Sequence, residues 1–185
     1  MKTNINDYLT HNNNNIMKKI ALLLTAFIGL TALQSCTIEE YYDDQNISQV
    51  FELTNETIST PEDAYTNSAT WNFTTPIYDS DNVLVYRWQG NSWTLVPVSY
   101  NLGGGDLIKY DYDFTRYDVK VYVSTSFPMN ELTNAEYNQF IYRQTFRVVV
   151  VPGGFQQKMN FSDYNATISA LGLENAPVKT LQLKK

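Results

Sequence analysis

Cysteine and histidine are nearly missing from this sequence of 185 residues, which has one of each, Cys36 and His11. A single cysteine excludes a disulfide bond within the chain, so the hydrophobic core has to hold the fold. Hydrophobic residues make up 43% of the chain and aromatic residues 14%, which is sufficient for such a core. This composition argues against disorder of the whole chain.

Long hydrophobic runs are missing as well. The longest mostly apolar run, residues 20–33, has about 14 residues, whereas a membrane-spanning helix needs about 20. It follows Lys18 and Lys19, and it ends at the sequence Leu33-Gln34-Ser35-Cys36. Two positive charges, an apolar run, a small residue and a cysteine, in this order, are typical of a bacterial lipoprotein signal peptide.

The sequence therefore predicts a signal peptide over residues 17–35, which cleavage removes. Cys36 then carries diacylglycerol, and a second acyl chain such as palmitate on the new amino terminus makes the membrane attachment durable. The alternative is an ordinary secretory signal followed by an incidental cysteine. Residues 1–16 are rich in Asn and fit no part of a signal, so we expect a mis-annotated upstream extension with translation starting at Met17.

Removal of the leader also removes most of the catalytic options. The mature chain loses His11, and Cys36 is committed to its lipid, so neither an imidazole nor a free thiol remains. This excludes Ser-His-Asp and Cys-His catalysis and the usual zinc sites. The net charge changes from −6 to −8, because Lys2, Lys18, Lys19 and Asp7 leave with the first 35 residues. We therefore expect no nucleic-acid partner.

An acidic stretch follows the predicted anchor. We interpret residues 36–48 as a lipidated tether, in which Glu39, Glu40, Asp43 and Asp44 lie just after Cys36. The stretch resembles the acidic export signal that sends lipoproteins of the Bacteroidota to the cell surface, on the outer face of the outer membrane. The alternative is a solvated spacer on a lipoprotein that faces the periplasm.

Residues 49–185 show alternation with a period of two, which is typical of strands. The strand candidates are Asn82–Trp88, residues 93–100, 107–114, 119–123 and 140–151, with weaker ones at 49–53, 69–74 and 177–183. Gly90-Asn91 is a suitable two-residue hairpin loop. One helix is predicted near the C-terminus, capped by Ser162 and ended by Gly172. The pattern predicts an all-β fold, an antiparallel β-sandwich of immunoglobulin-like type with one short helix.

A resemblance rests on two strand-like segments. Tyr78-Asp79-Ser80-Asp81 leading into Val85-Tyr86-Arg87, and Phe146-Arg147 leading into residues 148–152, are similar to segments of small, uncharacterised surface lipoproteins of flavobacteria and other Bacteroidota. Some of those proteins carry a dihydrolipoamide dehydrogenase name. This sequence does not support that name, because it lacks a G-x-G-x-x-G motif and a redox cysteine pair. The resemblance implies a surface lipoprotein and no particular activity.

Carboxylate pairs are the remaining enzymatic option. Asp111 and Asp113 lie two apart in one strand candidate, and Asp79 and Asp81 flank a turn. Such pairs could serve glycoside hydrolysis or a weak calcium site, but acids that face solvent are the favoured interpretation. We expect no metal site and no cofactor.

Trp88 and Trp93 are the candidate ligand-binding residues. A two-residue loop at Gly90-Asn91 places them directly opposite each other on one face of a hairpin. The face of Leu84, Tyr86 and Trp88 is bulky and uncharged, so we expect it to face the core, with the pair closing one end. The alternative is that the tip exposes the pair as a stacking platform for sugar rings.

From these patterns we expect a lipid-anchored, extracytoplasmic lipoprotein without catalytic activity. It would act as a binding or structural module of the cell envelope, with an envelope protein or a glycan as its partner. The alternative is a carbohydrate-active surface protein, either a glycan-binding accessory or a carboxylate-dependent hydrolase. A groove lined by exposed Trp or Tyr would favour a glycan.

Overall fold

The computed structural model describes residues 47–155 and 158–184. Cys36, the predicted signal peptide and most of the predicted acidic tether lie outside the described residues. Within the described part, no helix is long and apolar enough to span a membrane.

The first sheet has four antiparallel strands in the order β1-β9-β4-β5. They are β1 (Gln49–Glu56), β9 (Gln144–Val151), β4 (Asn82–Trp88) and β5 (Trp93–Leu95). β9 lies between β1 and β4, and it corresponds to the longest strand pattern in the sequence. Four consecutive valines at its end are buried. Both faces of this sheet are therefore covered near that end.

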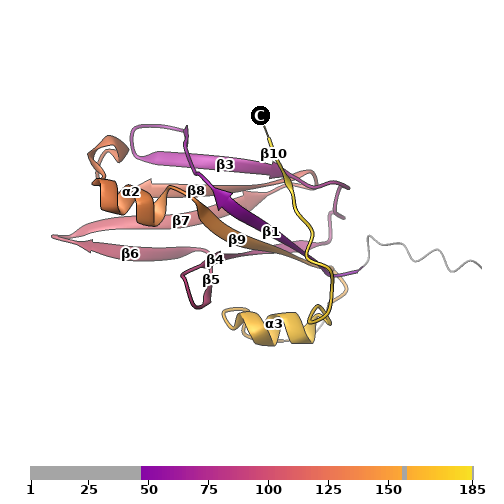
Figure 1. The fold of residues 1–185 in the computed structure, drawn as a ribbon. Coiled ribbons are helices and arrows are strands. Elements are labelled where there is room, and N and C mark those ends of the chain that lie inside the picture. Colours follow the sequence, from indigo (N-terminus) through magenta and orange to yellow (C-terminus); the bar gives the residue numbers. More distant parts are fainter. Residues whose placement is uncertain (1–46, 156–157, 185) are drawn as a thin grey trace, which may run out of the picture. The chain divides into compact units, whose positions relative to one another are not determined.

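The second sheet is built around β8 (Asp118–Thr125), whose alternating valines are fully buried. Its order is β10-β3-β8-β7-β6, with β2 paired to β3. The other strands are β2 (Thr60–Pro61), β3 (Thr66–Asn72), β6 (Val98–Gly103), β7 (Asp106–Phe114) and β10 (Gln182–Leu183). All of the pairings are antiparallel. Figure 1 shows the two sets of strands as separate layers.

The main hydrophobic core lies between the two sheets. Val85 and Phe146 of the first sheet pack in one cluster with Trp71, Tyr110 and the valines of the second, and each of these side chains is fully buried. The predicted all-β antiparallel sandwich is thus confirmed. That the sandwich is immunoglobulin-like stays a prediction.

In the part of the chain that the structure describes, two short α-helices and one 3-10 turn accompany the strands. The predicted C-terminal helix is confirmed as α3 (Tyr164–Ala170), but Asp163 caps it instead of Ser162, since the Asp163 carboxylate accepts from the Ala166 N–H at 3.0 Å. α3 covers the outer face of the first sheet beside β5 (Figure 1). Sequence analysis missed α2 (Asn134–Phe140), which follows the turn η3 (Met129–Glu131).

Several predicted strands have different bounds in the structure. The strand expected over residues 177–183 is limited to Gln182–Leu183, and the one expected over residues 69–74 spans Thr66–Asn72. The strand expected over residues 140–151 begins only at Gln144, because residues 134–140 form α2. The strand expected over residues 93–100 is broken at Val96-Pro97. Pro97 has no N–H to donate to a sheet, and the chain crosses there from β5 in the first sheet to β6 in the second.

Candidate functional site

The β4–β5 hairpin forms as predicted. The Gln89 N–H donates to the Ser92 carbonyl oxygen at 2.9 Å, and Gly90 has φ 86°, a conformation that glycine adopts without strain. Trp88 pairs with Trp93 across the hairpin, and their ring centroids are 4.9 Å apart. The hairpin therefore holds two indole rings together at one end of the first sheet.

The two indoles differ in their surroundings. Trp93 is half-buried, with its ring 5.5 Å from the Tyr164 ring of α3 and 4.6 Å from the Arg147 guanidinium carbon. Trp88 is 36% exposed. Trp93 is thus the packed member of the pair, and it supports Trp88, which presents a ring to solvent.

The predicted core face of β4 packs against α3 and not between the two sheets. The face that points between the sheets carries Val83, Val85 and Arg87, while Tyr86 lies on the other face and packs under α3. In the sequence alone, the charge on Arg87 indicates that the face of Val83 and Val85 points to solvent. That charge is nevertheless buried, since Arg87 is only 6% exposed.

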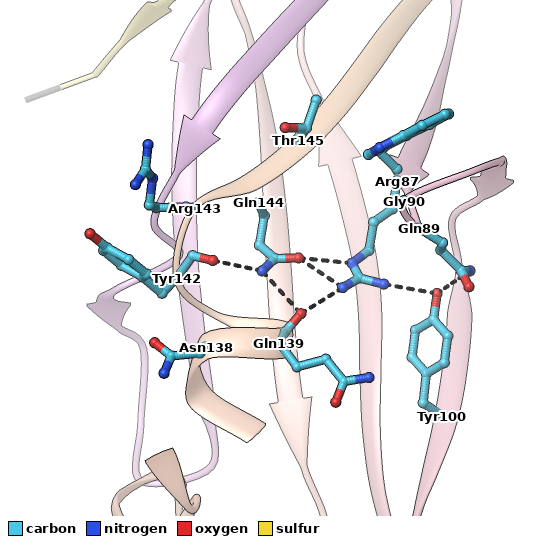
Figure 2. A pocket seen from close by; sticks show the side chains of 11 residues that line it. Arg87, Gln89, Gly90, Tyr100, Asn138, Gln139, Tyr142, Arg143, Gln144 and Thr145 are labelled. Atoms are coloured by element: carbon cyan, nitrogen blue, oxygen red, sulfur yellow. Dashed lines mark hydrogen bonds between the residues drawn. The ribbon is translucent and has the colours of Figure 1, made fainter. Parts of the chain in front are cut away.

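Neutral acceptors and aromatic rings surround the Arg87 guanidinium (Figure 2). Its Nε and Nη2 donate to the Gln144 side-chain oxygen at 3.1 and 2.8 Å, and Nη2 also donates to the Gln139 carbonyl oxygen at 2.8 Å. The guanidinium carbon lies 4.7 Å from the Tyr110 ring centroid and 5.5 Å from that of Phe140. Burial raises the pKa of Tyr110, so this phenol stays neutral beside the cation.

Tyr100 joins this network at the edge of the second sheet. Its hydroxyl oxygen accepts from Arg87 Nη1 at 3.3 Å and from Gln89 Nε2 at 2.6 Å. The Gln89 amide also donates to the Thr94 hydroxyl at 2.6 Å. The network therefore ties the hairpin in one sheet to β6 in the other.

A hollow of about 630 Å³ opens above this network. Figure 2 shows side chains from β4, β6, α2 and the start of β9 around it. The lining residues are Arg87, Trp88, Gln89, Gly90, Tyr100, Asn138, Gln139, Tyr142, Arg143, Gln144 and Thr145. Its volume falls in the range of roughly 300 to 1,000 Å³ that small-molecule sites occupy.

The turn between α2 and β9 forms one wall of the hollow. Arg143 has φ 51°, a left-handed conformation that ends the helix and reverses the chain into β9. Its Nε donates to the Asn55 side-chain oxygen at 3.2 Å. Tyr142 is 44% exposed, and its ring stacks on that of Tyr137 at 6.3 Å with 18° between the planes. This wall therefore presents an aromatic face and a cation to solvent.

The predicted carboxylate pairs lie elsewhere, and each acid has a local partner. Asp111 pairs with Lys109 at 2.6 Å, and Asp113 accepts from the Tyr122 hydroxyl at 2.8 Å. Asp79 pairs with Arg116 at 3.4 Å. These contacts fit the interpretation of surface acids.

Asp81 is the exception, because it is 5% exposed. Its carboxylate accepts from the Tyr78 N–H at 3.1 Å and from the Gly153 N–H at 3.2 Å, and so it joins two turns. A Cβ atom at Gly153 would come within 2.4 Å of the Ser80 carbonyl oxygen, so this approach requires glycine. Asp81 therefore has a structural role. Among the described residues, no group of three or more His, Cys, Asp or Glu side chains is arranged to hold a metal ion.

The arrangement is suited to binding a polar ligand with an apolar face. The residues that line the hollow include Trp88, Tyr142, several amides and two arginines, and the ring of Trp88 packs against that of Trp93 beside it. Sequence analysis found Trp88 but missed the others, because it assigned residues 142–145 to a regular strand. A Thr-x-x-Glu pattern at Thr133 and Glu136, which forms a capping box at the start of α2, could have revealed the helix.

No protein family model matches the chain, and comparison with curated proteins and with solved structures also found no match.

Proposed function

We propose that this chain is a lipid-anchored, extracytoplasmic lipoprotein whose domain is a non-catalytic binding module of the cell envelope. The order of Lys18, Lys19, the apolar run and Cys36 supports the anchor. The acidic stretch after Cys36 supports exposure on the outer face of the outer membrane, with the periplasmic face as the alternative. The ligand should therefore be sought in the cell envelope.

The lining of the hollow supports binding without catalysis. Its eleven residues include no Asp, Glu, His or Cys, and its two arginines are its only charged side chains. General acid–base catalysis requires a group that gains and loses a proton near neutral pH, and an arginine remains protonated there. The predicted mature chain also has no histidine and no free thiol.

Trp88, which is exposed and is one of the residues that line this hollow, is the observation that carries the ligand class, which we propose to be a glycan. A sugar ring has one face of C–H groups, which stack on an aromatic ring, and a rim of hydroxyls, which pair with amides. Tyr142, a second aromatic residue that lines the hollow, is also exposed. A hydrolase is not favoured, because it needs two carboxylates roughly 5 to 10 Å apart across the site.

Retention in gels that contain dissolved polysaccharides tests this proposal with the full-length chain in detergent. A panel of neutral and acidic polysaccharides should include at least one that retards the wild-type protein. In Trp88→Ala, retention should fall at least about fivefold, because roughly 1 kcal/mol of ring stacking is lost. Tyr117→Ala is the matched control, since Tyr117 is 60% exposed and lies outside the hollow.

Thermal melting separates a binding role of Trp88 from a packing role. We expect Trp88→Ala to melt within about 5 °C of the wild type, because the ring is already partly in water. A large loss of melting temperature with unchanged retention would instead assign Trp88 to packing. If no polysaccharide in the panel retards the wild type, the glycan proposal is wrong.

A further inference from the structure

Two guanidinium groups at the hollow lack a carboxylate partner. Among the described arginines, Arg116 pairs with Asp79 and Arg147 pairs with Glu52, at 3.4 and 2.8 Å. Within residues 47–155 and 158–184, no ion pair within 4.0 Å is present for Arg87 or Arg143, and both line the hollow. The uncompensated positive charge of the described arginines is therefore gathered at one place, in a chain whose net charge is −6.

Arg87 is a buried cation that has no counter-ion among the described residues. It is 6% exposed, and its recorded acceptors are an amide oxygen, a backbone carbonyl and a phenol oxygen, all of them neutral. Burial of a charge is costly unless an opposite charge or a set of dipoles compensates it. The dipoles and rings around Arg87 hold it in place, and its positive potential still reaches the hollow that it lines.

Tyr100 can donate a hydrogen bond from its hydroxyl group to a ligand in the hollow. Its hydroxyl oxygen accepts from Arg87 and from Gln89, so both lone pairs are engaged. The phenolic proton is then available for a ligand, and the ligand atom that receives it has to be an acceptor. A cation directly behind the phenol strengthens that donation toward an anionic oxygen.

Arg143 supplies a second positive group, at the opposite wall. Its side chain is exposed, and its one recorded side-chain hydrogen bond goes to a neutral amide, that of Asn55. Figure 2 shows Arg143 and Tyr100 on opposite sides of the hollow, with Gln144 and Arg87 between them. Two positive positions on opposite sides of one hollow suit a chain of sugars with an acidic group on more than one unit.

We propose that the hollow binds an acidic polysaccharide, one that carries carboxylate or sulfate groups on several of its sugar units. One acidic group is received at Arg143 and another at the Tyr100–Arg87 end. This inference rests on the proposed glycan-binding function and specifies its ligand class. Carboxylate and sulfate share the chemistry that a guanidinium recognises, which is a planar or trigonal set of anionic oxygens.

Paired polymers that differ only in charge test the inference on the full-length chain in detergent. The probes are polygalacturonate against its methyl-esterified form, and dextran sulfate against dextran. We expect at least one acidic member to be retained about tenfold better than its neutral partner. The pair that shows the difference identifies carboxylate or sulfate as the preferred group.

Substitutions test whether the acidic polymer binds at the hollow. Arg143→Gln removes one exposed positive charge at the hollow and should weaken retention by the acidic polymer about tenfold, as should Arg143→Asn, which suits the left-handed backbone there. Lys109→Gln is the matched control, because it also removes an exposed positive charge but lies outside the hollow. Tyr100→Phe should weaken retention without loss of the positive charge.

Three results would overturn the inference. Equal retention by the acidic and neutral members of both pairs would be consistent with glycan binding but would contradict a preference for acidic groups. Equal weakening by Arg143→Gln and Lys109→Gln would show a general charge effect and not a site. If none of the four polymers is retained, the acidic-polysaccharide inference is wrong, and the broader panel described above decides the glycan proposal separately.

Discussion

Tyr86 lies at the contact between the first sheet and α3. Its hydroxyl donates to the Phe161 carbonyl oxygen at 2.7 Å, and its ring packs edge-on against Tyr164 with centroids 5.1 Å apart. Burial raises the pKa of Tyr86 to about 12 from an ordinary value of 10. The phenol is therefore neutral in the folded protein at a pH where the unfolded chain has already lost this proton.

This difference predicts alkaline sensitivity. Between pH 10 and 12 the folded state holds a proton that the unfolded state lacks, so the free energy of unfolding falls by up to roughly 1.4 kcal/mol per pH unit for this one tyrosine. Tyr86→Phe should lose about 1 kcal/mol at pH 7, since its hydrogen bonds are gone, and should show a shallower decline above pH 10. Urea unfolding between pH 7 and 11 measures both effects, and parallel pH profiles for the two proteins would contradict the assignment.

Arg87 is the residue that made the prediction for the two faces of β4 differ from the structure. A charged side chain normally marks the solvent side of a strand, so the sequence favoured the face of Leu84 and Tyr86. The acceptors that make burial of Arg87 tolerable come from Gln139 and Gln144, more than 50 residues away along the chain. Local alternation carries no information about such distant partners, so neither the buried cation nor the hollow above it could be predicted.

Among the secondary-structure elements, α3 allows the contribution of a helix cap to the stability of the fold to be tested. Asp163 accepts from the Ala166 N–H, and the helix buries Tyr164 and Ile168 against the outer face of the first sheet. Asp163→Ala should lower the free energy of unfolding by about 1 kcal/mol, because a free N–H is left at the start of the helix. Asp163→Asn, which keeps the acceptor, should be close to wild type.

Urea unfolding at pH 7 checks this prediction, and Ser162→Ala provides its contrast. Ser162 donates its hydroxyl proton to Asn160 at an exposed position and makes no contact with the N–H groups of the helix, so its loss should change stability by less than about 0.5 kcal/mol. A larger loss for Ser162→Ala than for Asp163→Ala would restore Ser162 as the cap.

The strands were more predictable than the connections between them. Alternation located β4, β7, β8 and β9, because one face of each is buried between the sheets and the side-chain period is two. α2 and α3 both have seven residues, but the prediction of α3 used its cap and its terminal glycine, whereas the Thr-x-x-Glu cap of α2 at Thr133 and Glu136 was not considered. The break at Pro97 and the change of sheet depend on tertiary packing. The candidate site lies at these connections, so sequence analysis found Trp88 and Trp93 and missed the walls around them.

For the whole molecule, the proposed anchor at Cys36 has a direct chemical test. Mass spectrometry of the mature N-terminus should show a lipid-modified Cys36, and Cys36→Ser should release the protein from the membrane fraction, because no thiol remains for the lipid. The domain of residues 49–185 should keep its strand-rich far-ultraviolet circular dichroism in that variant. Cleavage at another position, with an unmodified cysteine, would show an ordinary secreted protein.

The central claim is that the ligand binds at the hollow beside Trp88, and the three tryptophans of the chain allow a direct measurement. Trp71 is fully buried in the core, Trp93 is half-buried, and Trp88 is exposed at the hollow. In full-length protein labelled with fluorotryptophan, fluorine NMR gives one signal for each indole, and Trp88→Phe identifies the signal of Trp88. Titration with a polysaccharide that retards the protein should shift the Trp88 signal and leave that of Trp71 unchanged. Retention of the polysaccharide with no change at Trp88 would contradict the account.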